Sequence, residues 1–129
     1  MTPGSTCTRP NAQRYAERIN YCNRNVSSSL KARVFENYSR LGFELLDRFD
    51  RAEFKIDHYI PLCMGGSNEE DNLWPQHRHV YEVTDPLEQV ACEKMAQGKL
   101  LQRDAIHLIR QGKADLGAVD KIFRQIQSL

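Results

Sequence analysis

The chain has 129 residues, of which 40% are hydrophobic and 27% are charged, and its formal net charge is +1. These values are typical of an ordinary globular domain, and the small net charge argues against a protein that coats nucleic acid. No stretch approaches 18 consecutive apolar residues, so the sequence predicts no membrane-spanning helix.

Positive charge is concentrated in the first part of the chain. Residues 1–51 contain nine Lys and Arg against five Asp and Glu, whereas residues 52–129 contain nine against twelve. A modest basic patch in the first part would hold phosphate groups, but solvated charges without a partner explain these counts equally well. At this length we expect one domain, residues 1–129, with a core of its own.

Residues 1–28 are predicted to form an arm with little core of its own. Several proline, glycine and asparagine residues interrupt regular structure, and only a short helix is expected, over residues 12–19. Met1 precedes the sequence Thr-Pro-Gly-Ser, which suggests a start codon placed on a mature chain whose export signal was removed.

The first long helix is expected over residues 29–41. Three serines at positions 27–29 offer N-caps, hydrophobic residues recur at helical spacing, and Gly42 ends the pattern. The hydrophobic residues of the segment 43–49 lie among charges, and they would extend the helix as a short turn that leads into a strand at Phe54.

The most informative stretch is residues 54–79, which read FKIDHYIPLCMGGSNEEDNLWPQHRH. An apolar run carries an adjacent Asp57 and His58, breaks at two glycines at positions 65–66, and resumes at Asn72. This pattern predicts a strand, a turn and a second strand, followed by the approach to a helix.

Several motifs in this stretch resemble the HNH branch of the ββα-metal endonucleases. They are Asp57-His58, Ile60-Pro61-Leu62, Gly65-Gly66-Ser67-Asn68 and Asn72-Leu73-Trp74-Pro75. In that family the acid binds a divalent metal ion, the histidine is the general base, and the asparagine holds the histidine in position. The resemblance implies these roles for Asp57, His58 and Asn72. It also implies an α+β, mostly helical fold with a ββα-metal core over residues 54–97.

The chemistry of phosphodiester hydrolysis suits the same residue types. The attacking water must lose a proton, and imidazole is the side chain whose ordinary pKa lies nearest to working pH, which suits His58. A divalent ion held by the carboxylate of Asp57 would neutralise charge on the phosphoryl and leaving oxygens. Consecutive residues of a regular strand point to opposite faces, so both side chains can serve one site only where the strand twists or ends.

The chain departs from the family at the further metal ligand. The family takes this ligand from the helix after the second strand, at a position where this chain has Tyr81. Among the neighbours His77, His79 and Glu82 we expect His77 to bind the ion, because a rigid proline lies two residues before it. His79 and Arg78 are then expected to contact phosphate, with a solvent-facing role as the alternative for each histidine. The expected ion is Mg²⁺, and a histidine ligand would also suit Mn²⁺, Zn²⁺ or Ni²⁺.

Three helices are predicted after the hairpin. Asp85 as N-cap, Pro86 at the first helical position and Glu88 at the third would make an acidic capping box, which argues against Asp85 and Glu88 as metal ligands. The helices are expected over residues 85–97, 100–111 and 116–128.

The four cysteines show no C-x-x-C spacing, which argues against a zinc knuckle or a thioredoxin-type site. Of the three pairings we favour Cys7–Cys22, which would tie down the arm, and Cys63–Cys92, which would pin the catalytic turn to the following helix. Each would contribute about 3–4 kcal/mol in the chain-entropy model. Disulfides indicate the periplasm or the cell exterior, and four buried thiols in a cytosolic protein are the alternative.

The leading functional hypothesis is a metal-dependent endonuclease that cuts DNA, or RNA, with little sequence preference, because no reading helix or finger is recognisable. A non-catalytic secreted binding module on the same scaffold is the second hypothesis, although it has no need of a base next to a carboxylate. The third is a toxin nuclease domain, which would be recognised by an inhibitor or immunity protein as its partner.

Overall fold

The computed structural model describes residues 2–40 and 51–129. The described residues form an α+β fold that is mostly helical, as the sequence predicts. The helices are α1 (Ser28–Tyr38), α3 (Arg78–Ala96), α4 (Gln102–Ala114) and α5 (Val119–Gln127), and the antiparallel hairpins are β1 (Ala12–Arg14) with β2 (Ile19–Tyr21) and β3 (Phe54–His58) with β4 (Leu73–His77). The expected turn over residues 43–49 lies outside the described residues.

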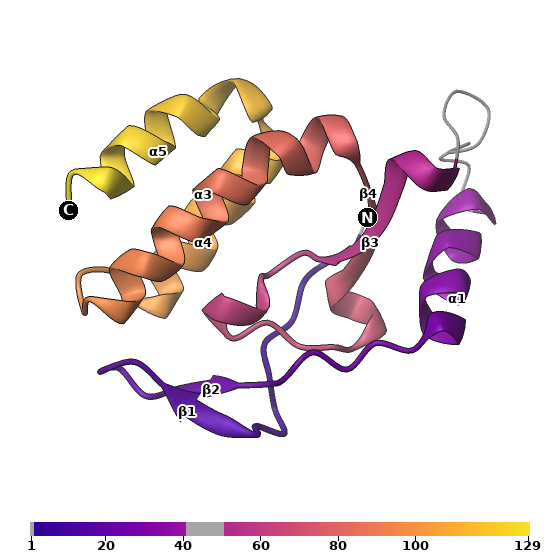
Figure 1. Ribbon diagram of the computed structural model, residues 1–129, viewed down its shortest axis with the longest axis horizontal. Coiled ribbons are helices and arrows are strands. Elements are labelled where there is room, and N and C mark those ends of the chain that lie inside the picture. The colour runs from indigo at the N-terminus through magenta and orange to yellow at the C-terminus, as the bar shows by residue number, and fades with distance from the viewer. Residues whose placement is uncertain (1, 41–50) are drawn as a thin grey trace.

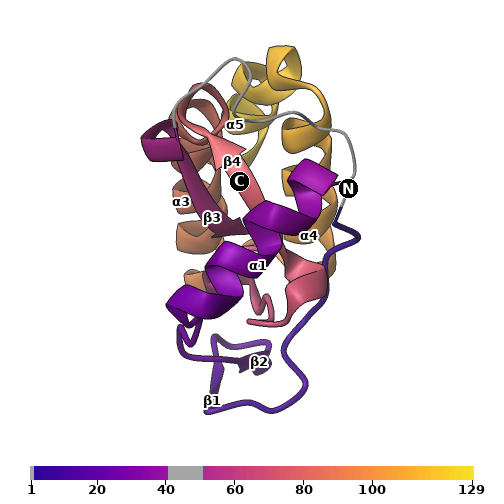
Figure 2. The ribbon, with the colours of Figure 1, turned by 90° about the vertical axis from the view of Figure 1, so that its right-hand side faces the viewer.

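The β3–β4 hairpin lies between α1 on one side and the three C-terminal helices on the other (Figures 1 and 2). Phe54 pairs with His77 and His58 with Leu73, so alternate residues of each strand face the same side. Phe54, Ile56 and Leu73 pack against α1. The opposite face turns toward α3, where the Gln76 side-chain amide donates to Thr84 Oγ1 at 3.3 Å.

The larger hydrophobic core is formed by α3, α4 and α5 together with the residues that follow β3. Its buried members on the helices include Leu87, Val90, Met95, Ala105, Ile109, Val119, Ile122 and Ile126. Tyr59 and Ile60 belong to the same core, and they carry the chain from the hairpin onto the helices. The end of β3, where the predicted catalytic pair lies, is therefore held against the helical unit.

The double glycine shapes the loop between β3 and β4. Gly65 has a φ of +85°, which side-chain-bearing residues rarely adopt, and a Cβ on Gly66 would lie 1.8 Å from the Ile60 carbonyl oxygen. Only glycine fits so close an approach of the two backbone segments. The turn predicted at this point is present, and it brings the loop back over the residues that follow His58.

The N-terminal arm folds as a hairpin, so the helix predicted over residues 12–19 is wrong. Ala12 pairs with Tyr21 and Arg14 with Ile19, and the turn between the strands uses positive φ angles at Tyr15 and Arg18. A helix of eight residues is only marginally stable without a packed face. The two strands of the hairpin instead pair with each other, and the Cys7–Cys22 disulfide links the segments on either side of them. Tertiary pairing therefore overrides the local helical pattern.

The arm lies along the loop between β3 and β4. Gly4 donates its backbone N–H to the Asp71 carbonyl at 2.8 Å, Cys7 donates to Gly65 at 2.8 Å, and Thr6 forms a bridge with Gly66. These contacts join residues that are far apart in sequence, so no local pattern could have predicted them.

Helix α3 begins earlier than the sequence predicts. His77 is its N-cap, with Nδ1 accepting the His79 backbone N–H at 3.1 Å, and Pro86 lies inside the helix. A proline in a helix interior costs about 3 kcal/mol or more because one backbone hydrogen bond is lost. Burial of Thr84, Leu87 and Val90 on either side of it offsets that cost. The predicted capping role of Asp85 is therefore wrong.

Both predicted disulfides, Cys7–Cys22 and Cys63–Cys92, are present. The first closes the arm, and the second joins the loop after β3 to α3. Two disulfides are compatible with an oxidising compartment. Among residues 2–40 and 51–129, no helix has the length and hydrophobicity needed to cross a membrane.

Reduction of the two disulfides is expected to lower thermal stability, because each constrains the unfolded chain. Cys63→Ser/Cys92→Ser should lower the free energy of unfolding by about 4 kcal/mol and Cys7→Ser/Cys22→Ser by about 3 kcal/mol, since Cys63–Cys92 closes the longer loop. Thermal melts with and without dithiothreitol, together with melts of the two double variants, measure both effects. Four free thiols in the unfolded, unreduced protein would contradict the expectation.

Candidate functional site

His58 is the last residue of β3 and is only 3% exposed. Its Nε2 lies 2.9 Å from Asn68 Oδ1. Burial lowers the pKa of the imidazole, and the bond to Asn68 and the charge of Asp57 oppose that shift without cancelling it. The ring is therefore held neutral near neutral pH, which is the state that a general base requires.

Asp57 points to the opposite face of β3, as strand geometry requires. Its Oδ1 accepts the backbone N–H of His58 at 2.9 Å. Its Oδ2 is buried and has no hydrogen-bond partner within the described part of the chain, and the Lys55 ammonium lies 3.6 Å away. A buried carboxylate oxygen without a hydrogen bond is costly, and the nearby Lys55 ammonium offsets part of that cost.

Two further carboxylates, Asp85 and Glu88, approach Asp57 from α3. One oxygen from each of the three residues lies within 4.8 Å of the others. The two α3 residues are three positions apart in the helix and therefore share one face. Sequence analysis assigned both to a helix cap, and it missed this convergence because it placed the start of α3 too late.

Two lysines partly neutralise the carboxylates. Lys55 Nζ lies 3.2 Å from Asp85 Oδ2, and Lys113 Nζ lies 2.8 Å from Glu88 Oε1. Burial raises the pKa of Glu88 to about 7, and the nearby Lys113 lowers it only in part. When all the groups are ionised, three negative charges face two positive ones, and protonation of Glu88 below about pH 7 brings these charges into balance.

Lys113 also ties α4 to the end of β3. Its side chain is completely buried, and the ammonium donates to the carbonyls of His58 at 3.2 Å and Tyr59 at 2.8 Å. One residue thus contacts the backbone of the predicted base and the carboxylate of Glu88. Sequence reasoning missed Lys113 because a lysine near the end of an amphipathic helix is usually exposed to solvent.

His77 does not lie beside Asp57. It pairs with Phe54, whereas Asp57 pairs with Trp74, so the two residues are separated by about 10 Å along the hairpin and face opposite sides. Its Nε2 instead lies 3.5 Å from Glu53 Oε2, and its ring packs on Phe54 with 5.2 Å between centroids. The structure thus gives His77 a capping and packing role, and it does not place His77 where it could share an ion with Asp57.

The other residues predicted around the second strand are not part of the group of three carboxylates. Arg78 is 3.4 Å from a Glu53 oxygen, the His79 ring lies 4.6 Å from the His77 ring, and Glu82 is exposed. Tyr81, where the family has a ligand, contacts the Lys55 ammonium, 4.1 Å from its ring centroid. At this position the chain brings a lysine, and not a metal ligand, toward the acidic cluster.

Asn72 is fully buried and acts on the backbone after His58. Its side chain accepts the Ile60 N–H at 2.9 Å and donates to the carbonyls of Ile60 at 3.0 Å and Ser67 at 2.9 Å. Asn72 therefore contacts the backbone of the loop that follows His58, and any effect on the orientation of His58 would be indirect. The side chain that contacts the imidazole is that of Asn68.

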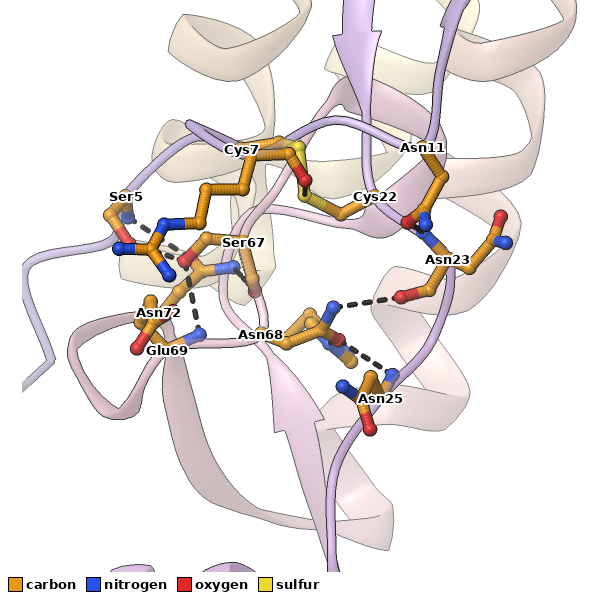
Figure 3. The surroundings of a disulfide bond; sticks show 12 residues. Ser5, Cys7, Asn11, Cys22, Asn23, Asn25, Ser67, Asn68, Glu69 and Asn72 are labelled. Atoms are coloured by element: carbon orange, nitrogen blue, oxygen red, sulfur yellow. Dashed lines mark hydrogen bonds between the residues drawn. A yellow bond between two sulfur atoms is a disulfide. The ribbon is translucent and has the colours of Figure 1, made fainter.

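Asn68 is the second residue that sequence reasoning did not assign, although it belongs to the quoted glycine motif. Its amide connects the loop to the N-terminal arm, donating to the Asn23 carbonyl at 2.8 Å and accepting the Asn25 N–H at 3.1 Å (Figure 3). The signal that could have found it is its position just after the double glycine, where the chain returns toward β3.

No family model, curated protein or solved structure matches this chain. The function of the chain is therefore inferred from its own residues and from the motifs that they form.

Proposed function

We propose that this protein is a metal-dependent endonuclease of the HNH type that hydrolyses phosphodiester bonds of DNA, with RNA as the alternative substrate. The observation that carries the proposal is the position of Asp57 and His58 at the end of β3, where side chains from opposite faces of the strand would both border a phosphate that lies across the strand end. His58 is buried and biased toward the neutral state, and among the described residues Asp57 Oδ2 has no hydrogen bond and lies beside two further carboxylates. A base and a cation-binding carboxylate are the two groups that hydrolysis of a phosphodiester requires.

The donor set suits a hard divalent ion. Asp57, Asp85 and Glu88 would hold it through carboxylate oxygens, the ligands that Mg²⁺ prefers. This assignment replaces His77 as the second ligand and removes the argument for Zn²⁺ or Ni²⁺ that a histidine would provide. When bound, the ion would supply charge neutralisation at the phosphate. Lys55, which pairs with Asp57 and Asp85, would have to withdraw to admit it, and its side chain is 41% exposed.

His58 would take the proton from the attacking water. Its lowered pKa, which burial causes, keeps the ring ready to accept a proton near neutral pH. Asn72 supports this role by fixing the loop that follows β3, and Lys113 supports it by fixing the carbonyls of residues 58 and 59. These residues hold the end of β3 in place without contacting the substrate.

The substrate would be bound mainly through its phosphates, with little sequence preference. The excess of basic residues in the first part of the chain supports this mode of binding. The two disulfides support a periplasmic or secreted enzyme, because such bonds persist in oxidising compartments.

Incubation of the purified protein with supercoiled plasmid and Mg²⁺ tests the proposal. Nicked and linear products should appear, EDTA should abolish them, and excess Mg²⁺ should restore them. Asp57→Asn should lose cleavage, whereas Asp104→Asn, which changes an exposed carboxylate on α4, should not. Absence of cleavage of DNA and RNA with Mg²⁺ or Mn²⁺, or cleavage that EDTA leaves unchanged, would refute it.

The ligand assignment has its own test in calorimetric titration with Mg²⁺ or Mn²⁺. Asp85→Asn and Glu88→Gln should each weaken metal affinity by about 10-fold or more. Loss of a residue that binds the ion directly should weaken affinity at least as much as loss of a residue that only orients a ligand. His77→Ala should leave the affinity unchanged. The reverse pattern would return His77 to the site and remove the α3 carboxylates from it.

A further inference from the structure

The amide of Asn68 has a defined orientation, because its two backbone partners have fixed hydrogen-bonding roles. The Asn23 carbonyl can only accept a hydrogen bond, so the atom 2.8 Å from it is the NH₂ group. The Asn25 N–H can only donate, so the atom 3.1 Å from it is the oxygen. The usual ambiguity between nitrogen and oxygen in an asparagine amide is thereby removed.

This orientation determines the protonation pattern of the His58 ring. Asn68 Oδ1 carries no hydrogen, so at 2.9 Å the His58 Nε2 must be the donor. A neutral imidazole carries one N–H, and its lone pair is then on Nδ1. The hydrogen bond therefore sets both the tautomer and the direction from which a proton can be accepted.

The partners of Asn68 belong to the N-terminal arm, which is closed by the Cys7–Cys22 disulfide. The Asn23 N–H is itself bonded to Asn11 Oδ1 at 2.8 Å, across the β1–β2 hairpin. Figure 3 shows the disulfide and the asparagines of residues 11, 23 and 25 around the Asn68 side chain. Both cysteines are buried, so the arm presents a fixed backbone to the loop.

We propose that Asn68 is a positioning residue that holds His58 as the Nε2–H tautomer with Nδ1 as the proton acceptor, and that the disulfide-closed arm holds Asn68. The catalytic consequence rests on the proposed nuclease function, whereas the tautomer and its hydrogen bond do not. An arm without a core of its own thereby contributes to the site through backbone groups.

Nitrogen-15 NMR of histidine-labelled protein at alkaline pH tests the structural part without any assay of activity. In the wild-type protein, His58 should show an unprotonated Nδ1 and a slowly exchanging Nε2–H proton. Asn68→Ala should lose that proton signal and move both nitrogens toward the averaged shifts of a free imidazole. Asn68→Asp keeps the acceptor oxygen for Nε2–H but loses the donor to the Asn23 carbonyl, so it should retain part of the signal. Asn37→Ala, which removes a partly exposed amide on α1 that donates to Glu70, is the control.

The disulfide variants test the role of the arm. Cys7→Ser/Cys22→Ser should reproduce the His58 spectrum of Asn68→Ala, whereas Cys63→Ser/Cys92→Ser should keep the wild-type spectrum although it loses more stability. An Nδ1–H tautomer in the wild-type protein, or a His58 spectrum unchanged by Asn68→Ala, would overturn the proposal. A spectrum changed by Asn68→Ala but not by loss of the Cys7–Cys22 bond would overturn the part that concerns the arm.

Kinetics then connect the positioning role to catalysis. Asn68→Ala should lower kcat by about 10- to 100-fold, the range found when partners that orient metal-bound histidines are removed, and leave KM unchanged. Asn68→Asp should recover part of the lost kcat. A wild-type protein that cleaves nothing would refute the proposed function while the spectra still decide the inference, and an unchanged kcat in an active Asn68→Ala variant would refute the catalytic role of Asn68 alone.

Discussion

Replacement of His58 by alanine is expected to abolish cleavage of plasmid DNA while the protein remains folded. Removal of a general base lowers the rate by about 10²- to 10⁴-fold, and the remaining groups cannot replace the imidazole at the end of β3. Metal affinity should stay close to that of the wild-type protein, because Asp57 and the α3 carboxylates are on the other face of the strand. Plasmid nicking rates and calorimetric titration with Mg²⁺ measure the two effects separately.

His107→Ala is the matched control, because His107 is an exposed histidine on α4 that is assigned no part in the candidate site. Its cleavage rate should equal that of the wild-type protein. An equal loss of metal affinity and of rate in His58→Ala would show that His58 is a ligand. A rate that survives the substitution would remove His58 from the mechanism.

Replacement of Lys113 by methionine is expected to destabilise the fold by about 3–5 kcal/mol. The substitution keeps an unbranched side chain that is one atom shorter, but it leaves the Glu88 carboxylate and the carbonyls of residues 58 and 59 without the lysine as donor. Removal of one partner of a buried ion pair lowers the free energy of unfolding by about this amount. The midpoint of thermal unfolding should fall by about 10–20 °C for a domain of this size.

Lys121→Met, which changes an exposed lysine on α5, should leave the midpoint nearly unchanged. Lys113→Met/Glu88→Gln should recover part of the lost stability, because the second substitution removes the uncompensated carboxylate. If Lys113→Met had the same midpoint of thermal unfolding as the wild-type protein, the buried ion pair would have no structural role. If the double variant were no more stable than the single one, the carbonyl contacts would account for the loss.

The features that the sequence predicted correctly are those with a local signal. Helix α1 follows from serine caps and helical spacing, the β3–β4 hairpin from two apolar runs around a double glycine, and α4 and α5 from amphipathic periodicity. The two disulfide pairings also follow from their positions along the chain. Each of these inferences depends on residues close together in sequence, or on a small number of pairings.

The errors arise where distant segments decide the structure. The segment 12–19 has a helical pattern, but pairing within a closed arm makes it a hairpin. Asp85 and Pro86 have the pattern of a helix start, but packing of α3 against the core extends the helix back to Arg78. That extension brings Asp85 toward Asp57, so the misplaced helix boundary also hid the cluster of carboxylates that the structure forms there.

The parts of the candidate site contributed by Asn68 and Lys113 could not be predicted for a similar reason. Asn68 acquires its role only when the arm lies beside the loop, and Lys113 only when α4 packs against the end of β3. Both residues reach His58 or its backbone from segments that periodicity treats as independent. Whether a charged or amide side chain is buried depends on tertiary packing, and patterns in a single sequence give little indication of it.

The position of the arm along the loop implies an order of events during oxidative folding. Cys7 and Cys22 flank a local hairpin and are separated by 15 residues, whereas Cys63 and Cys92 are separated by 29 and approach only when α3 has docked. Closure of a short loop has the smaller entropic cost, so we expect the first pair to oxidise before the second. The arm would then reach the β3–β4 loop as a preformed unit, and late oxidation of Cys63 and Cys92 would lock the assembled site.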